Sequence, residues 1–429
     1  MGCVWVPNLA DPGWLTEVLS RHADALGISG AVTAVQLLDA RLSHPHRPGS
    51  SLCRGWATCT VTAGSGPPVQ LYLQGFSDDD AGDLAWEQVR DHPIGHLAGR
   101  LPEVGLIVWP FPADPRLVSL PTLVDPRLAT GVLPEAVRRV LDLLPGEEPR
   151  VTVVRYQPEA SATLRLEADR DGASVYAKLL GDGSVTQIAA RHQALWCEAA
   201  RRSDLRLAEP LGADPDHGML WTRGIPGGPL SSTVNPDRLP EQAAAVGALL
   251  AALHATPLDL VRTVTVDELL GEARKKAGKL ARAHPGIAGL VHDLVTTATA
   301  RRGDVVEELG VALHGDFHLD QLVGSPDGPV LVDLDSIIRG APEVDLAEFL
   351  VDLSLRGLPG TVTEDVARTL LASYTLSAGA DIDRALLAVC ADAEFVNRCY
   401  RHLRRHASGW QRALESELGR HAQLVALIR

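Results

Sequence analysis

The stretch Leu313–Leu350, LHGDFHLDQLVGSPDGPVLVDLDSIIRGAPEVDLAEFL, decides the fold of this 429-residue chain. It places several acids, two histidines and an amide around two short apolar runs that predict strands. Phosphoryl transfer requires an acid that positions the attacking hydroxyl, and oxygen ligands that hold Mg²⁺ on the phosphates. Asp316 fits the first requirement, and Gln321 and Asp333 fit the second. The other parts of such a site must then come from the rest of the chain.

The composition is that of an ordinary globular protein, with 45% hydrophobic and 22% charged residues. The longest apolar helix candidate, Ala243–Leu253, is too short to span a bilayer. The N-terminus lacks a basic segment followed by an apolar one, and no two of the six cysteines form a C-x-x-C pair. We therefore expect a cytoplasmic protein with reduced thiols and no membrane partner.

The net charge of −14 argues against nucleic acid as the main partner, because phosphate backbones are bound by basic patches. It is compatible with a cationic small substrate, although acidic surfaces commonly serve solubility alone. Only four lysines occur, and three of them lie on one polar helix. The fourth, Lys178, stands alone in an apolar strand-like run, which calls for an explanation.

Three domains are predicted, with boundaries near residues 135 and 226. Residues 1–135 predict an α+β unit with a helix, four strands and a hairpin over residues 56–75 around the turn GSGPP. Residues 136–226 predict a small lobe with a three-stranded antiparallel meander, a helix and two further strands. Residues 227–429 predict a mainly helical lobe, interrupted by the short strands Val311–Leu313 and Val330–Asp333. The fold class is therefore α+β.

This arrangement resembles the aminoglycoside phosphotransferase branch of the protein-kinase-like fold over roughly residues 150–400. Five motifs in order, with a lone strand lysine upstream, carry the resemblance: LWTRGIPGGPL (Leu220–Leu230), AVGALLAALHATP (Ala245–Pro257), HGDFHLDQ (His314–Gln321), LVDLDS (Leu331–Ser336) and GAPEVDLAEFL (Gly340–Leu350). The resemblance implies a bilobal kinase-like fold and a kinase that uses ATP and Mg²⁺ on the hydroxyl of a small molecule. A sugar, an amino sugar or an aminoglycoside-like antibiotic is the expected acceptor.

The resemblance assigns a role to each matching residue. Asp316 would accept or orient the proton of the substrate hydroxyl, while His314 braces the loop. Lys178 would pair with the phosphates of ATP as a point charge. In protein kinases a Glu from the next helix fixes this Lys, and either Gln193 or Glu198 has the right spacing here. We prefer Glu198 because it carries a charge.

The metal-binding residues implied by the resemblance are Gln321, Asp333 and Asp335. Asp335 is expected on the same side of a strand as Asp333, as a second ligand or a substrate contact. The family usually has Asn in place of Gln321, so the amide oxygen stands on a longer side chain here. A subgroup of maltokinases and glucosamine kinases has a similar loop, H-G-D-x-H-x-x-Q, and an N-terminal cap of which residues 1–135 would be the analogue. Its next motif, D-F-E-G, differs from Asp333–Ser336 here, so the likeness bears on the substrate class only.

Two further segments concern the nucleotide. The hinge Trp221–Arg223 is expected to read the purine through backbone groups, which leave no signature in side chains. The predicted phosphate loop, Arg155–Thr163, contains no glycine, although glycine lets backbone N–H groups approach phosphate closely. The small residues Ala160, Ser161 and Ala162 are the available substitutes.

Two other functions are compatible with these motifs. A kinase of a Ser or Thr in a peptide or protein would use the same chemistry, but only eleven residues separate Asp333 from Asp345, which leaves no obvious activation segment. A non-catalytic nucleotide-binding module of the pseudokinase type is the alternative that Gln321 and the glycine-poor loop motivate. The sequence does not indicate an oligomeric state.

Overall fold

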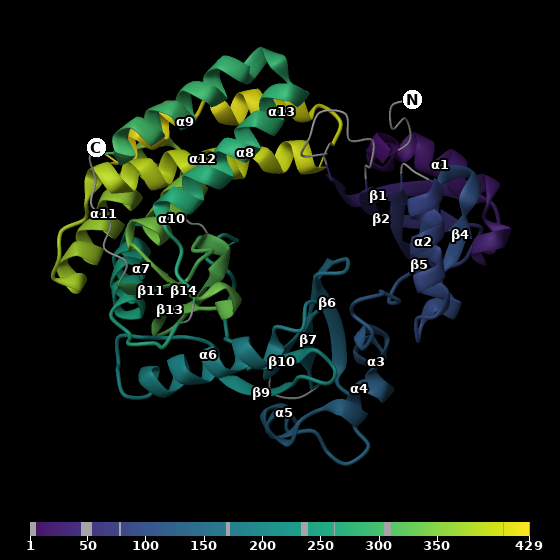
Figure 1. Cartoon of the computed structure of the whole chain (residues 1–429). Coiled ribbons are helices and arrows are strands. Elements are labelled where there is room, and N and C mark those ends of the chain that lie inside the picture. Colours follow the sequence, from purple (N-terminus) through teal and green to yellow (C-terminus); the bar gives the residue numbers. More distant parts are fainter. Residues whose placement is uncertain are drawn as a thin grey trace. The chain divides into compact units, whose positions relative to one another are not determined.

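The computed structural model describes residues 6–43, 54–76, 79–168, 172–232, 239–260, 262–303, 310–405 and 407–428 (Figure 1). The chain divides into two compact units. The first contains residues 1–185, 213–221 and 401–413, and the second contains residues 186–212, 222–400 and 414–429. Each unit buries its own set of apolar side chains. The cytoplasmic location was predicted in part from the N-terminal residues. The first five of these, residues 1–5, lie outside the described part.

The first unit begins with an antiparallel sheet in the order β1-β2-β3-β5-β4. Its strands are β1 (Val32–Ser43), β2 (Arg54–Ala63), β3 (Val69–Phe76), β4 (Gly99–Leu101) and β5 (Leu106–Pro110). The register Val61↔Val69 confirms the hairpin predicted over residues 56–75. The short strand β4 was not predicted.

Two helices accompany this sheet, α1 (Pro12–Arg21) and α2 (Asp79–Arg90). Helix α1 begins at Asp11, whose carboxylate accepts a 2.8 Å hydrogen bond from the N–H of Gly13. Leu15 and Leu19 of α1 are fully buried in one core cluster with strand residues such as Leu73. A separate 3₁₀ turn follows α1 at Asp24–Leu26.

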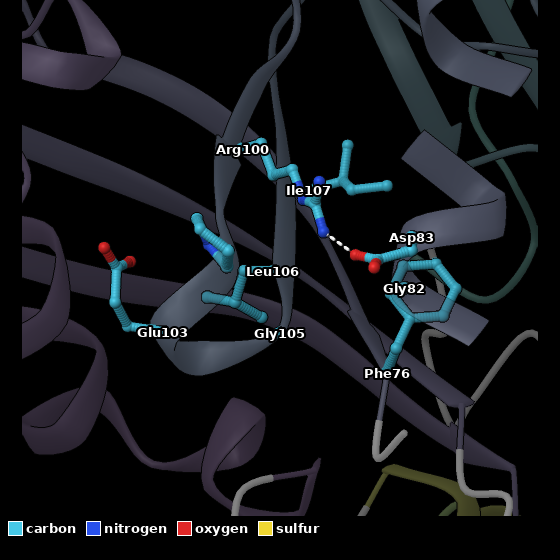
Figure 2. A pocket seen from close by; sticks show the side chains of 9 residues that line it. Phe76, Gly82, Asp83, Arg100, Glu103, Gly105, Leu106 and Ile107 are labelled. Atoms are coloured by element: carbon cyan, nitrogen blue, oxygen red, sulfur yellow. Dashed lines mark hydrogen bonds and ion pairs between the residues drawn. The ribbon is translucent and has the colours of Figure 1, made fainter. Parts of the chain in front are cut away.

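A pocket of ≈ 410 Å³ lies in this part of the first unit (Figure 2). The basic side chain that lines it, Arg100, forms an ion pair with Asp83 of α2. Both side chains are partly exposed, and each neutralises the other. The remaining lining residues are Phe76, Gly82, Pro102, Glu103, Gly105, Leu106 and Ile107.

A second sheet has the order β6-β7-β8-β10-β9. Its strands are β6 (Arg150–Gln157), β7 (Ser161–Glu167), β8 (Ser174–Leu180), β9 (Pro210–Asp214) and β10 (Met219–Arg223). The pairing of β6, β7 and β8 confirms the predicted antiparallel meander. On β8 the alternate residues Val175, Ala177 and Leu179 are buried, so Lys178 lies on the opposite, less buried face.

Three short helices precede this sheet, α3 (Leu120–Val124), α4 (Pro126–Val132) and α5 (Glu135–Leu141). Helix α5 ends at Leu141, because Asp142 adopts a left-handed conformation with φ +49°. The predicted domain boundaries near residues 135 and 226 stay predictions.

The second unit is mainly helical, as predicted. Its helices are α6 (Val185–Ala199), α7 (Leu239–His254), α8 (Val266–Ala283), α9 (Ala288–Arg302), α10 (Glu343–Leu355), α11 (Gly360–Ala378) and α14 (His421–Ile428). Helices α12 (Arg384–Arg405) and α13 (Trp410–Leu418) each have one end in residues 401–413 of the first unit. Helix α8 begins with a capping box in which Thr265 and Glu268 satisfy each other's backbone N–H. Among the described residues, no helix has the length and apolar character needed to cross a membrane.

The motif region of the second unit contains two small antiparallel sheets. They pair β11 (Val311–Leu313) with β14 (Ile338–Gly340), and β12 (Leu322–Ser325) with β13 (Gly328–Leu331). The prediction that a strand reaches Asp333 is wrong, since β13 ends at Leu331 and Asp333 has φ +58°. Asp335 lies in the 3₁₀ turn Leu334–Ser336, so the alternation of a strand does not relate it to Asp333.

Helices α7 and α11 lie side by side, and Gly247 of α7 permits their close approach. A Cβ atom at Gly247 would overlap the carbonyl oxygen of Leu370. We expect Gly247→Ala to reduce the free energy of unfolding by about 1–3 kcal/mol, because two backbones must separate. Chemical denaturation would measure this loss.

Gly271 of α8 is the matched control, because nothing lies within 4 Å of a Cβ built there. Gly271→Ala should stabilise the protein by roughly 0.5–1 kcal/mol through helix propensity alone. Equal effects of the two substitutions would contradict the close packing of α7 on α11.

Candidate active site

The loop His314–Gln321 is anchored by Asp345, near the start of α10. The carboxylate of Asp345 has no exposed surface and accepts hydrogen bonds from the backbone N–H groups of His314 (2.7 Å) and Gly315 (3.0 Å). Gly315 has φ +77°, and a Cβ there would overlap the carbonyl oxygen of Ser336. One buried carboxylate therefore fixes two successive peptide groups just before Asp316.

A histidine from α7 completes this anchor. His254 Nε2 lies 3.0 Å from Asp345 Oδ2, and the Tyr374 hydroxyl lies 2.8 Å from His254 Nδ1. Burial, followed by the nearby charges of Glu343 and Asp345, raises the pKa of Tyr374. Its hydroxyl therefore stays protonated, and the carboxylate of Asp345 accepts from Nε2–H of His254. A hydrogen-bonded chain runs from Tyr374 through His254 and Asp345 to the loop backbone.

His314 braces the loop against the segment that precedes Asp333. Its Nε2 donates a 3.0 Å hydrogen bond to the carbonyl oxygen of Val332. The side chain is fully buried, and its Nδ1 atom has no hydrogen-bond partner within the described ranges. This geometry agrees with the bracing role inferred from the sequence.

Three side chains approach the carboxylate of Asp316. His318 Nε2 and Gln321 Nε2 lie 3.5 and 3.4 Å from Oδ2, and Arg398 Nη2 from α12 lies 3.5 Å from Oδ1. Burial favours the neutral acid, but the His318 hydrogen bond and the charges of His318 and Arg398 outweigh it. They lower the pKa of Asp316 from 3.8 to about 2. The group is therefore an ionised, weakly basic acceptor that is suited to orienting a hydroxyl.

Glu348, which the sequence analysis did not single out, has the opposite environment. Its Oε2 accepts a 2.6 Å hydrogen bond from the N–H of Phe317, the residue that follows Asp316. Burial, then the negative charges of Asp345 and Glu394, raise the pKa of Glu348 well above its ordinary value. The sequence contains one signal for Glu348: it lies three residues after Asp345 in a helix, so the two side chains share a face.

Arg398 was also missed by the sequence analysis. It lies on α12, where its Nε donates a 2.6 Å hydrogen bond to Glu394 one turn earlier. This pair places a guanidinium beside Asp316, more than eighty positions away in the chain. No local pattern could have indicated the contact, because it depends on how α12 packs within the second unit.

The predicted metal ligands lie at the end of the β12–β13 hairpin. The N–H of Val332 donates a 3.0 Å hydrogen bond to the carbonyl oxygen of Gln321, which places the two segments side by side. The Gln321 amide nitrogen faces Asp316, so its oxygen points away from that carboxylate. The left-handed conformation of Asp333 turns the chain directly after the hairpin.

These donors are hard oxygens, which suits Mg²⁺. The described residues contain no group of three or more His, Cys, Asp or Glu side chains that could hold a metal ion. Mg²⁺ commonly takes one or two protein ligands and completes its shell with phosphates and water, and Gln321, Asp333 and Asp335 offer an amide oxygen and carboxylates. The residues present therefore fit the ion, and the assignment of Gln321, Asp333 and Asp335 stays a prediction.

Helix α6 contacts the backbone around Asp335. Arg191 Nη1 donates a 3.0 Å hydrogen bond to the carbonyl oxygen of Ile337, and Nη2 lies 3.4 Å from that of Asp335. On the same helix Glu198 forms an ion pair with Arg201, and Gln193 contacts Cys197. The assignment of a helix partner to Lys178 stays a prediction.

The hinge residues have different surroundings. Trp221 is fully buried, and its indole N–H has no hydrogen-bond partner in the described part of the chain. Arg223 closes β10, where its N–H donates to the carbonyl oxygen of Glu209 at 2.9 Å and its guanidinium pairs with the Glu209 carboxylate. Their predicted role in reading a purine stays a prediction.

Residues 146–388, more than half of the chain, match the profile of the phosphotransferase enzyme family, APH. The chain belongs to this family. It is therefore an ATP-dependent phosphotransferase with an alcohol group as acceptor, and its fold is protein-kinase-like, with antiparallel sheets in the N-terminal part and a mainly helical C-terminal part. The family resemblance and the fold class inferred from the sequence are confirmed.

Three solved structures illustrate the similarity. An aminoglycoside-3′-phosphotransferase of type VIII is 19% identical, with 61% of this chain and 99% of that chain covered and a TM-score of 0.43. Choline kinase LicA from Streptococcus pneumoniae is 13% identical, with 70% and 98% covered and a TM-score of 0.46. Macrolide 2′-phosphotransferase MphH from Brachybacterium faecium is 17% identical, with 68% and 96% covered and a TM-score of 0.44. No curated protein matches the chain.

The anchor predicts a stability effect at Asp345. In Asp345→Asn one acceptor oxygen becomes an NH₂ group that faces a backbone N–H, and the substitution should reduce the free energy of unfolding by about 2–4 kcal/mol. Urea denaturation of the full chain would measure this loss. Asp293→Asn, at an exposed position of α9, should change stability by less than about 0.5 kcal/mol. A small effect at both positions would show that the loop does not depend on Asp345.

Proposed function

We propose that this protein transfers the γ-phosphate of ATP, with Mg²⁺, to a hydroxyl group of a small molecule, with sugars, amino sugars and aminoglycoside-like antibiotics as the candidate acceptors. The observation that carries the proposal is Asp316, held ionised in a loop whose backbone is fixed by the buried carboxylate of Asp345. Membership of the phosphotransferase family supports the same reaction class.

Asp316 acts on the acceptor hydroxyl in this proposal. Its carboxylate accepts a hydrogen bond from the hydroxyl and directs a lone pair of that oxygen toward the γ-phosphate. With a pKa of about 2, it takes up the proton only as the new oxygen–phosphorus bond forms and the hydroxyl becomes strongly acidic. His318 and Arg398 keep it ionised before that moment.

Gln321 and Asp333 would hold Mg²⁺, with Asp335 as a further ligand or substrate contact. When bound, the ion neutralises charge on the phosphates and orients them. The protein contributes an amide oxygen and carboxylates on a short hairpin and the turn that follows it. Lys178 would contact the α/β-phosphates, with Glu198 as the preferred helix partner, and backbone groups of Trp221–Arg223 would contact the purine.

A small acceptor is favoured by the short path from Asp333 to Asp345. The eleven intervening residues, Leu334–Val344, are taken up by a 3₁₀ turn, by β14 and by the start of α10. A peptide kinase normally uses a longer segment here to position its substrate chain. This compact connection supports a small molecule over a Ser or Thr in a peptide.

Asp316→Asn tests the proposed reaction. We expect turnover to fall by about 10³-fold, because the amide cannot take up the proton, while Mg·ATP binding is retained. The assay is ATP consumption against pools of sugars, amino sugars, aminoglycosides and Ser/Thr peptides. Asp320→Asn, in the same loop but paired with Arg356, is the control and should keep most of the activity. Turnover on the peptide pool alone, or ATP binding without any turnover, would contradict the small-molecule proposal.

Asp333→Asn tests the metal site. Loss of a charged ligand should raise the Mg²⁺ concentration needed for half-maximal nucleotide binding by about tenfold or more. Titration of Mg²⁺ at fixed ATP would measure this change. Asp327→Asn, in the exposed turn between β12 and β13, removes the same charge nearby and should leave the titration unchanged. An equal shift in both variants would indicate a general effect of charge.

A further inference from the structure

The turn between β6 and β7 occupies the place of the predicted phosphate loop but has no glycine. The N–H of Ala160 donates a 3.1 Å hydrogen bond to the carbonyl oxygen of Gln157, which closes a four-residue turn. Pro158 is its second residue, and Glu159 is its third, with φ +60°. Such a turn normally has Gly or Asn at the third position. A Glu there costs about 1–2 kcal/mol, so other interactions must stabilise this conformation.

Two side chains of β3 hold the carboxylate of Glu159. The Tyr72 hydroxyl donates a 2.6 Å hydrogen bond to Oε1, and the amide nitrogen of Gln74 donates to the same oxygen. Trp109 fixes the orientation of that amide, since its indole N–H donates to Gln74 Oε1 at 2.9 Å. Burial and the charge of Glu159 raise the pKa of Tyr72 well above its ordinary value, which keeps the hydroxyl a donor.

The loop after β5 holds the backbone of the same turn. Asp114, which has no exposed surface, accepts hydrogen bonds through Oδ2 from the N–H of Glu159 (2.9 Å) and from the Tyr156 hydroxyl (2.8 Å). Its Oδ1 accepts from the N–H groups of Arg116 and Leu117, which fixes the carboxylate. Because Pro158 has no N–H, both N–H groups at the tip of the turn already have acceptors within the protein.

The end of β8 packs against this turn as well. The N–H of Gly181 donates a 2.9 Å hydrogen bond to the carbonyl oxygen of Ala160. A Cβ on Gly181 would lie 2.5 Å from the carbonyl oxygen of Glu159, so only glycine permits this approach. Lys178 stands three residues earlier on β8, opposite Thr163 of β7. The turn therefore borders the strand that carries the proposed phosphate-binding lysine.

We infer that the N-terminal domain acts as a clamp on this turn, and that Tyr72, Gln74 and Asp114 are positioning residues for nucleotide binding. The inference rests on the proposed function. The clamp holds Glu159 in a left-handed conformation that glycine would adopt unaided, and it turns the Glu159 carboxylate toward Tyr72 and Gln74. With its tip N–H groups occupied, the turn offers no backbone cradle. It acts on nucleotide binding through the end of β8, which packs against it and carries Lys178.

Two measurements on the full-length protein test the clamp. Tyr72→Phe removes one hydrogen bond to Glu159 and should weaken Mg·ATP binding about three- to tenfold, as measured by calorimetry. It should also accelerate hydrogen exchange in peptides that contain residues 157–161. Tyr176→Phe on β8 is the matched control and should change neither quantity.

The decisive variant adds Glu159→Gly to Tyr72→Phe. Glycine adopts the required φ without help and carries no carboxylate, so the double variant should recover the affinity for Mg·ATP. A role limited to packing would give no such recovery. If Tyr72→Phe impairs folding, Glu159→Ala and Glu159→Gly provide the same contrast in the turn, and only the alanine variant should bind Mg·ATP more weakly.

The outcomes separate the clamp from the proposed function. If the wild-type protein binds no Mg·ATP, the proposed function fails. If it binds Mg·ATP but Tyr72→Phe changes neither the affinity nor the exchange, the clamp alone is overturned. Fast exchange of the turn in the wild-type protein, or equal affinity of the Glu159→Ala and Glu159→Gly variants, would also overturn it.

Discussion

The hydrogen bonds to the buried carboxylate of Asp345 are the constraint on which the active-site loop depends. A carboxylate without exposed surface is costly unless its oxygens are satisfied, and here two backbone N–H groups and His254 satisfy them. The loop residues His314 and Gly315 supply those N–H groups, so the carboxylate and the loop each need the other. The conformation that presents Asp316 is thereby coupled to the packing of α7, α10 and α11.

The same region shifts the pKa values of two carboxyl groups in opposite directions. Asp316 is held ionised by His318 and Arg398, whereas Glu348 sits among other acids and has a raised pKa. If both were fully ionised, their repulsion would add to the cost of burying them. A protonated Glu348 still accepts from the N–H of Phe317 and thus supports the loop with less negative charge. The acid that carries the proposed chemistry can therefore remain ionised in a strongly acidic protein.

The sequence predicted the elements of the second unit well because they have strong local signals. The apolar run Ala243–Leu253 in α7, the amphipathic pattern of α8 and the motif HGDFHLDQ can each be recognised within about twenty residues. The sequence-based prediction was wrong where a single residue adopts a backbone conformation that differs from that of its neighbours. The apolar run that ends at Asp333 looks like one strand, but the left-handed residue breaks it and separates Asp333 from Asp335.

Contacts between distant segments were the other limit of sequence reasoning. Arg398 reaches Asp316 only because of the path of α12. The pKa of Glu348 is raised first by burial and then by charges on α10 and α12. The network around Glu159 depends on Tyr72 and Asp114, which are remote from it in the chain. A hydrogen-bonded Glu at a left-handed position has no sequence signature, since the conformation normally selects glycine.

The chain departs from the family pattern in the glycine-free turn between β6 and β7 and at Gln321, and each departure has its own physical explanation. In the β6–β7 turn, the N–H of Glu159 is bound by Asp114 and the N–H of Ala160 by the carbonyl oxygen of Gln157. Neither N–H is available to cradle a phosphate, so a glycine would bring no advantage there and Glu159 is tolerated. Gln321 keeps the amide oxygen that a magnesium ligand needs, while its nitrogen faces Asp316. Neither departure removes a donor or acceptor that the proposed reaction requires. The structure therefore supports an active kinase more strongly than a non-catalytic module.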